Sequence, residues 1–185
     1  MLSNNSKAAE PPYLKDTSKI WVDSILKNMT LDEKIGQLFM VAAYSNKDEA
    51  SYQTIDKYIK EYKVGGLIFF QGTPQKQAEL TNRYQAESKT PLWVGFDGEW
   101  GLGMRLDNTI SYPRQLTLGA IDNPELIYDM GKEVARQMKR IGIHINFAPD
   151  IDVNSNPNNP VINDRSFGDN KFGVVRRGLA YMQGM

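Results

Sequence analysis

The chain contains no cysteine and a single histidine, His144. The lack of cysteine excludes disulfides, thiolate nucleophiles and cysteine-based zinc sites, and one histidine excludes a multi-histidine metal site. We therefore expect no metal and no cofactor. His144 lies within an alternating apolar run, which favours a core or wall residue over a ligand.

Neither sign of charge is in excess, because Lys+Arg and Asp+Glu are both 22. This balance excludes the electrostatic footprint of a nucleic-acid partner or of binding to an anionic membrane surface. No apolar run approaches the roughly 20 residues that span a bilayer, so membrane insertion is not expected. An uncharged or polyhydroxylated small substrate fits this composition best.

The first residues, 1–19, are polar and lack the apolar middle of a signal peptide. We interpret them as a flexible leader, compatible with what remains after a signal has been removed. The sequence leaves the compartment open and favours a periplasmic or secreted location over a cytoplasmic one. Residues 20–185 are long enough for one domain with a sizeable core.

Short apolar runs alternate with amphipathic segments along these residues. Strands are predicted at 37–43, 64–70, 92–96 and 143–148, and helices at 20–29, from 30 onward, around 55–62, and at 74–88, 123–141 and 172–185. This alternation is typical of about four parallel β/α units with helices outside the sheet. Four units make half of an eight-stranded barrel, which needs roughly 250 residues, or a small doubly wound sheet. Periodicity does not choose between the two.

Acidic side chains follow the third and fourth apolar runs. Asp97, Glu99 and Trp100 come after one, and Asp150 and Asp152 after the other. Since ligands meet the carboxyl ends of parallel strands, these clusters predict a sugar site in which carboxylates accept hydroxyl hydrogen bonds and an aromatic face stacks on a pyranose. The alternatives are that the two later aspartates cap turns and that the tryptophan is packing.

Six segments then occur in one order between Thr30 and Met185. They are Gly36–Phe39, Val64–Phe69, Asp97–Arg105, Pro113 with Leu118–Ala120, Asn146–Val153 and Asn163–Gly168. The series resembles the N-terminal domain of glycoside hydrolase family 3, especially its bacterial β-N-acetylglucosaminidases. The resemblance implies an α/β fold, a TIM-type (β/α) barrel, of which residues 20–185 form a truncated N-terminal portion.

The resemblance also implies roles for particular residues. Asp97 and Arg165 would contact ring hydroxyls of the sugar before the scissile bond. Glu99 and Arg105 would support them, with Trp100 and Asp152 as further candidates. Trp100 departs from the family pattern, which has glycine there, and adds bulk beside Asp97. The structural alternative for Arg165 is a salt bridge to a nearby acid such as Asp164.

The activity implied is retaining hydrolysis of β-linked N-acetylglucosamine in cell-wall or related glycans. The family's Lys-His-Phe-Pro-Gly-His-Gly segment and its aspartate nucleophile are expected beyond Met185, so this chain holds no catalytic residue and is predicted to be inactive alone. Alternatives are a β-glucosidase of the same family, a non-catalytic sugar-binding module, or a small doubly wound nucleotide domain. That last alternative lacks a phosphate loop, since Gly101-Leu-Gly103 is too slight for a dinucleotide fingerprint.

A half-barrel also leaves strand edges and apolar surface uncovered. The sequence therefore predicts self-association through the exposed edges of the barrel.

Overall fold

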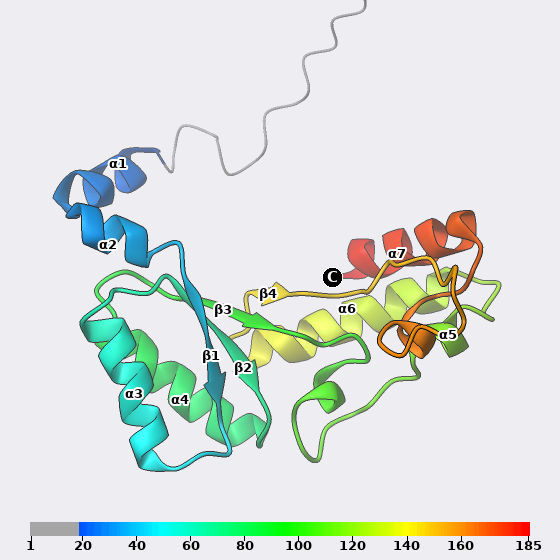
Figure 1. Cartoon of the computed structure of the whole chain (residues 1–185), viewed down its shortest axis with the longest axis horizontal. Helices are drawn as coiled ribbons and strands as arrows, with labels where there is room; N and C mark the ends of the chain where they lie inside the picture. The colour runs from blue at the N-terminus through cyan, green and yellow to red at the C-terminus, as the bar shows by residue number, and fades with distance from the viewer. Residues whose placement is uncertain (1–18) are drawn as a thin grey trace, which may run out of the picture.

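The computed structural model of the protein describes residues 19–185, so the expected leader lies outside them except for Lys19. Four strands, β1 (Met40–Tyr44), β2 (Gly66–Phe70), β3 (Trp93–Phe96) and β4 (Ile145–Asn146), form one parallel sheet in the order β1-β2-β3-β4. The helices that connect and flank them are α1 (Lys19–Asn28), α2 (Leu31–Gly36), α3 (Glu49–Lys60), α4 (Pro74–Glu87), α5 (Gln115–Leu118), α6 (Glu125–Arg140) and α7 (Lys171–Gly184) (Figure 1). Two 3-10 turns, η2 (Leu102–Met104) and η3 (Asn163–Arg165), complete the described chain.

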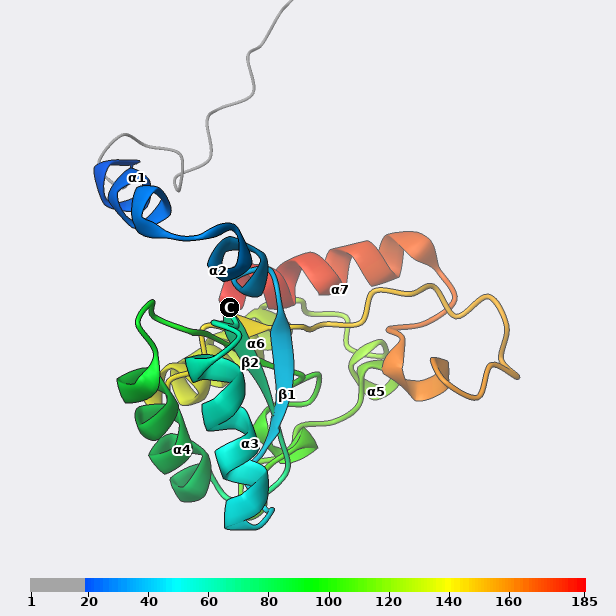
Figure 2. The same cartoon turned by 60° about the vertical axis from the view of Figure 1, so that its left-hand side comes forward.

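The sheet buries only one of its faces. Alternate residues such as Leu67, Phe69 and Phe96 are fully buried against side chains of α3, α4, α6 and α7, whereas Trp93 on the other face is 59% exposed. Helix α3 lies beside α4, and α6 lies beside α7 (Figures 1 and 2). A doubly wound sheet has helices on both faces and a reversal in strand order, so sequential strands with one-sided helices make this sheet part of a barrel.

The helix starts follow local signals in the sequence. Thr30 and Glu33 form a reciprocal capping box at α2, with N···O distances of 3.2 and 2.8 Å. Thr73 caps α4 through the backbone N–H of Lys76, and Pro74 occupies the first turn. The predicted apolar face of α6 is buried at Ile127, Met130, Val134 and Met138. These predictions are confirmed.

All four predicted strands begin too early: those predicted at 64–70 and 92–96 begin at Gly66 and Trp93, and the other two differ more in their bounds. The strand predicted at 37–43 begins only at Met40, because the chain turns after Gly36, where an added Cβ would lie 2.0 Å from the Tyr62 carbonyl oxygen. The strand predicted at 143–148 is reduced to Ile145–Asn146. Its ladder with β3 ends there because the Asn146 side chain, through Oδ1, accepts the N–H of Gly98 at 2.9 Å.

His144 is exposed, so the prediction that it belongs to the core is wrong. It lies on the edge of the sheet instead, where its Nδ1 accepts the backbone N–H of Val94 at 3.0 Å and its ring meets that of Trp93 edge-on at 5.8 Å. The alternative of a wall position therefore describes it better.

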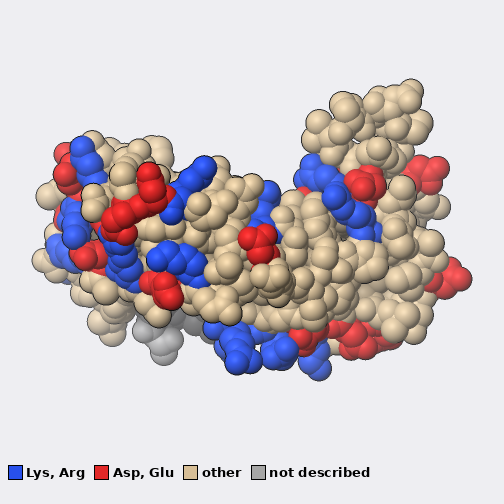
Figure 3. Space-filling view, turned by 90° about the horizontal axis from the view of Figure 1, so that it is seen from below, with Lys and Arg blue, Asp and Glu red and all other residues tan. Residues whose placement is uncertain are grey.

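The surface mixes both signs of charge. On the face drawn in Figure 3, lysine and arginine side chains are interspersed with aspartate and glutamate. Between residues 19 and 185, no helix combines the length and the apolar character needed to cross a bilayer.

Candidate functional site

Two residues of later elements, Asn146 of β4 and Tyr181 of α7, hold the loop after β3 in place. Gly98 donates its N–H to Asn146 and accepts the hydroxyl of Tyr181, on α7, at 3.1 Å. Tyr181 is fully buried, and its pKa is raised, chiefly because burial disfavours the phenolate. Asp97 and Glu99 flank this anchored glycine, so their positions at the end of β3 are set by β4 and α7.

Glu99 and Arg165 form the central ion pair of this rim. The Arg165 guanidinium donates from Nε to both carboxylate oxygens at 3.1 and 3.0 Å and from Nη2 to Oε1 at 2.7 Å. The Glu99 side chain is 4% exposed and the Arg165 side chain 30% exposed. These hydrogen bonds raise the pKa of Arg165. The arginine is therefore held as a cation by a buried carboxylate while part of it still faces solvent.

Asp150 is a second acid beside the same arginine. Its Oδ2 lies 3.4 Å from Arg165 Nη2, and its Oδ1 accepts the N–H of Asp152 at 2.9 Å. Burial raises the pKa of the Asp150 carboxyl, with the charge of Asp152 adding to the effect and Arg165 opposing it. Asp150 therefore caps a turn, as the alternative interpretation predicts. The side chain of Asp152 is exposed, and its backbone carbonyl accepts a hydrogen bond from Ser166 Oγ at 2.5 Å.

Asp97 forms a separate pair with Arg105, whose Nη2 donates to Oδ2 at 2.8 Å. The Arg105 guanidinium lies 4.7 Å from the centroid of the Phe70 ring. The side chains of Asp97 and Arg105 are 26% and 24% exposed, respectively. Asp97 belongs to the loop after β3, and Arg165 binds Glu99 of the same loop. The two predicted residues therefore meet at one loop but form two different ion pairs.

Trp100 packs against an arginine. The Arg114 guanidinium carbon lies 3.7 Å from the centroid of the Trp100 ring, and Arg114 Nη1 lies 3.6 Å from Asp164. Arg114 therefore covers one face of the Trp100 ring, and a sugar cannot stack on that face. This contact agrees with the alternative that Trp100 is a packing residue. The alternative of a salt bridge between Arg165 and a nearby acid is confirmed, but the acids are Glu99 and Asp150. Asp164 faces Arg114 instead.

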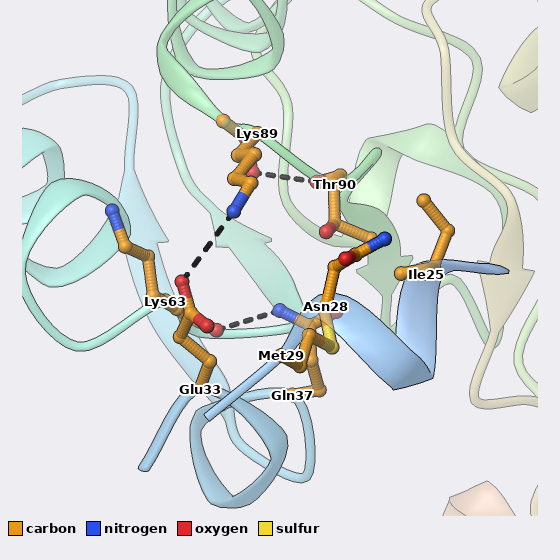
Figure 4. Close-up of a pocket in the computed structure, with 9 residues that line it drawn as sticks. Ile25, Asn28, Met29, Glu33, Gln37, Lys63, Lys89 and Thr90 are labelled. Atoms are coloured by element: carbon orange, nitrogen blue, oxygen red, sulfur yellow. Dashed lines mark hydrogen bonds and ion pairs between the residues drawn. The ribbon is translucent and has the colours of Figure 1, made fainter. Parts of the chain in front are cut away.

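The larger hollows of the described chain lie away from this rim. Two of about 670 and 660 Å³ lie beside α2 and α1, and neither is lined by Asp97 or Arg165. A smaller one of about 200 Å³ lies between α1, α2 and the segment after α4, where Lys89 points toward Glu33 across 3.7 Å (Figure 4). The candidate site is thus an open rim and not an enclosed pocket.

Comparison with known proteins identifies relatives of this chain. The chain is 35% identical over 142 residues to beta-hexosaminidase A of Pseudoalteromonas piscicida, an alignment that covers 70% of this chain and 24% of that protein. It is 27% identical over 176 residues to a beta-N-acetylglucosaminidase/beta-glucosidase of Cellulomonas fimi, covering 95% of this chain and 30% of that protein. The chain therefore spans less than a third of the length of these two curated relatives.

A solved structure of a glycoside hydrolase family 3 beta-N-acetylglucosaminidase from a Paenibacillus species superposes with a TM-score of 0.74 at 32% identity, covering 84% of this chain and 31% of that one. Residues 30–185 match the glycosyl hydrolase family 3 N-terminal domain. The parallel sheet, the one-sided helices and the match over these residues together show that the chain belongs to glycoside hydrolase family 3 and carries part of its barrel domain.

Proposed function

We propose that the chain supplies part of the sugar-binding rim of a retaining β-N-acetylglucosaminidase that acts on β-linked N-acetylglucosamine in cell-wall or related glycans. Asp97 and Arg165 are the residues that contact ring hydroxyls. Glu99 and Arg105 hold them in place.

The observation that carries it is the Glu99–Arg165 pair. Arg165 Nη1 donates one N–H to the carbonyl of Val161 at 3.3 Å, and its second N–H makes no further contact within the described residues. Likewise Asp97 uses Oδ2 for Arg105, and its Oδ1 accepts no hydrogen bond within them. A fixed donor and a free acceptor on one rim are what vicinal hydroxyls of a pyranose can satisfy.

These contacts bind substrate but do not break a bond. Retaining hydrolysis needs a carboxylate that attacks the anomeric carbon and a second group that protonates the departing oxygen. Within the described residues, Glu99 and Asp150 are engaged by Arg165, and His144 directly precedes β4, at the other end of the sheet from Asp97. We therefore assign binding to this rim and expect no hydrolysis by the 185-residue chain.

Titration of N-acetylglucosamine, followed by ligand-observed NMR, tests the binding role. We expect saturable binding that Asp97→Ala weakens by about tenfold or more, because a hydrogen bond to a charged group contributes about 1.5–3 kcal/mol. Arg165→Lys should weaken it too, since lysine cannot keep the forked contact with Glu99. The control Arg136→Lys alters an arginine that pairs with Glu133 on the surface of α6 and should leave affinity unchanged.

A β-glucosidase of the same family is the second candidate, since the relative from Cellulomonas fimi carries both activities in its name. Glucose in the same titration separates the two, because equal affinity for glucose would remove the preference for the N-acetyl group. An aryl β-N-acetylglucosaminide assay completes the test. Turnover by the 185-residue chain would overturn the assignment of binding without catalysis. If a longer protein that contains this domain binds the sugar but does not hydrolyse it, a non-catalytic sugar-binding module is favoured.

A further inference from the structure

Asp97 and Gly98 form the only Asp-Gly pair in the chain, and no Asn-Gly pair occurs. An aspartate before a glycine is the aspartyl sequence that isomerises most readily, because glycine has no Cβ to hinder the attack of its own nitrogen on the neighbouring carboxyl. The Asp97 side chain is 26% exposed, so water reaches it. The chain thus carries a chemically labile link directly after β3.

The isomerisation of such a pair needs only water and proceeds in two steps. The Gly98 nitrogen forms a bond to Cγ of the protonated Asp97 carboxyl, and the N–H hydrogen and the carboxyl OH leave as water, which closes a five-membered succinimide ring. Water then opens the ring. Addition at Cγ restores aspartate, whereas addition at the backbone carbonyl of residue 97 leaves isoaspartate, in which the main chain runs through Cβ and Cγ. The first step therefore requires that the Gly98 nitrogen lose its hydrogen and move toward Cγ.

The packing of the core requires glycine at position 98. A Cβ added there would lie 2.3 Å from Met138 Cε and 3.2 Å from Phe96 Cδ1. Both of these side chains belong to the core, at 2% and 0% exposed, respectively. Because the core is densely packed, the labile pair cannot be removed at Gly98 without shifting them.

A closed circuit of hydrogen bonds holds Gly98. Its N–H donates to Asn146 Oδ1 at 2.9 Å, Asn146 Nδ2 donates to the Tyr181 hydroxyl at 3.2 Å, and that hydroxyl donates to the Gly98 carbonyl at 3.1 Å. Asn146 is itself fixed by the pairing of β4 with β3. Arg105 Nη2 in turn donates to Asp97 Oδ2 at 2.8 Å. The attacking nitrogen and the carboxyl are therefore each engaged by a different partner.

We propose that Asp97 is a site of isoaspartate formation and that Asn146 suppresses the reaction by holding the Gly98 N–H. A nitrogen whose hydrogen is bound to a fixed acceptor must break that hydrogen bond before it can attack. Isoaspartate would add one methylene to the main chain at residue 97 and take the carboxyl away from Arg105. Asn146 therefore preserves the loop after β3 against chemical ageing, whether or not Asp97 contacts a sugar.

Ageing of the purified chain at neutral pH in water enriched in heavy oxygen tests the proposal, because each ring opening adds one heavy atom to the peptide that contains residue 97. Asn146→Ala should accumulate label and isoaspartate at least about fivefold faster than the wild type, the factor expected from the loss of one hydrogen bond. Tyr181→Phe is the matched control, since it opens the same circuit but leaves the Gly98 N–H on Asn146 Oδ1. It should react at close to the wild-type rate. Equal rates in the two variants would overturn the proposal, because holding the N–H would then have no effect of its own.

A second measurement does not depend on the folding of these two variants. With Asp97→Asn, the same attack releases ammonia instead of water and converts a neutral side chain to an acid, which isoelectric focusing detects. The folded Asp97→Asn chain should deamidate at least about fivefold more slowly than the same chain unfolded in urea. Equal rates would show that the hydrogen bond of Gly98 does not restrain its nitrogen and would refute the proposal.

Discussion

The hydroxyl of Tyr181 donates to the carbonyl of Gly98 at 3.1 Å and accepts from Nδ2 of Asn146 at 3.2 Å. This ring belongs to the last helix, whereas the carbonyl lies between the two acids that follow β3. The position of Asp97 and Glu99 therefore depends on a residue that is 83 positions from the glycine it holds.

Tyr181→Phe should lower the free energy of unfolding by about 1–3 kcal/mol, because it leaves the side-chain amide of Asn146 without its partner and the carbonyl of Gly98 with only the N–H of Gly101. Urea unfolding followed by circular dichroism measures the change. Tyr62→Phe serves as the control, since Tyr62 is 56% exposed. Equal effects of the two variants would show that the hydrogen bonds of Tyr181 contribute nothing specific.

Asp150→Asn should change stability in a pH-dependent way. The pKa of Asp150 is raised above its ordinary 3.8, chiefly by burial. A raised pKa means that the folded chain holds the proton more tightly than the unfolded chain, so this contribution is full below pH 3.8 and is lost as the pH rises through the folded pKa. The asparagine variant does not lose it, so its stability relative to the wild type should increase from pH 4 toward neutrality.

Thermal unfolding of both proteins at about pH 4 and about pH 7 measures this difference. Asp169→Asn removes the same charge from an exposed position and serves as the control. A relative stability of the Asp150→Asn variant that falls with rising pH would contradict the raised pKa.

A double-mutant cycle of Trp100→Leu with Arg114→Met should give a coupling of about 0.5–1 kcal/mol, as expected for an exposed cation–π pair. Urea unfolding of the four proteins supplies the values. The pair of Lys47 and Tyr44, where the ammonium lies 5.5 Å from the ring centroid, provides a comparison with a longer contact and should couple less strongly. If the coupling of Trp100 with Arg114 is zero, the stacking is only steric.

Gly119→Ala should destabilise the chain by about 2 kcal/mol or more, because the added Cβ would lie 2.1 Å from the carbonyl oxygen of Phe167, a backbone atom. Gly173→Ala in α7 meets the flexible Arg177 side chain at 3.0 Å and Asn170 Cβ at an ordinary 3.9 Å, and should be neutral or gain up to about 1 kcal/mol from helix propensity. Melting temperatures of the two variants should therefore move apart. A shift of both in the same direction and by the same amount would contradict the crowding at Gly119.

The fold was predictable because its signals are local. Apolar runs, the capping box at Thr30 and the Thr73-Pro74 start each depend on neighbours within one turn, and the structure has an element at each. The ends of strands depend on distant atoms instead. Gly36 stops the chain from entering β1 early because it abuts the Tyr62 carbonyl, and no local pattern reveals that contact.

The site was predictable in its residue types but not in its pairing. The motifs place Asp97, Glu99 and Arg165 at one rim, yet the choice of Glu99 over Asp164 as the partner of Arg165 depends on which acid is buried. Asp150 was missed as a partner of Arg165, although an acid directly after Pro149 and two residues before Asp152 was a signal. Arg114, which stacks on Trp100, was missed because it lies in a loop without periodicity, directly before the one-turn helix α5.

The Glu99–Arg165 pair joins residues 66 positions apart, so it also constrains the order in which the chain can fold during synthesis. The first three strands can associate as soon as Phe96 has left the ribosome, but the Glu99 carboxylate has no counter-ion until Arg165 has emerged as well. Because an unpaired carboxylate resists desolvation, the rim loop should stay hydrated in the nascent chain and collapse only after the fourth unit has been translated.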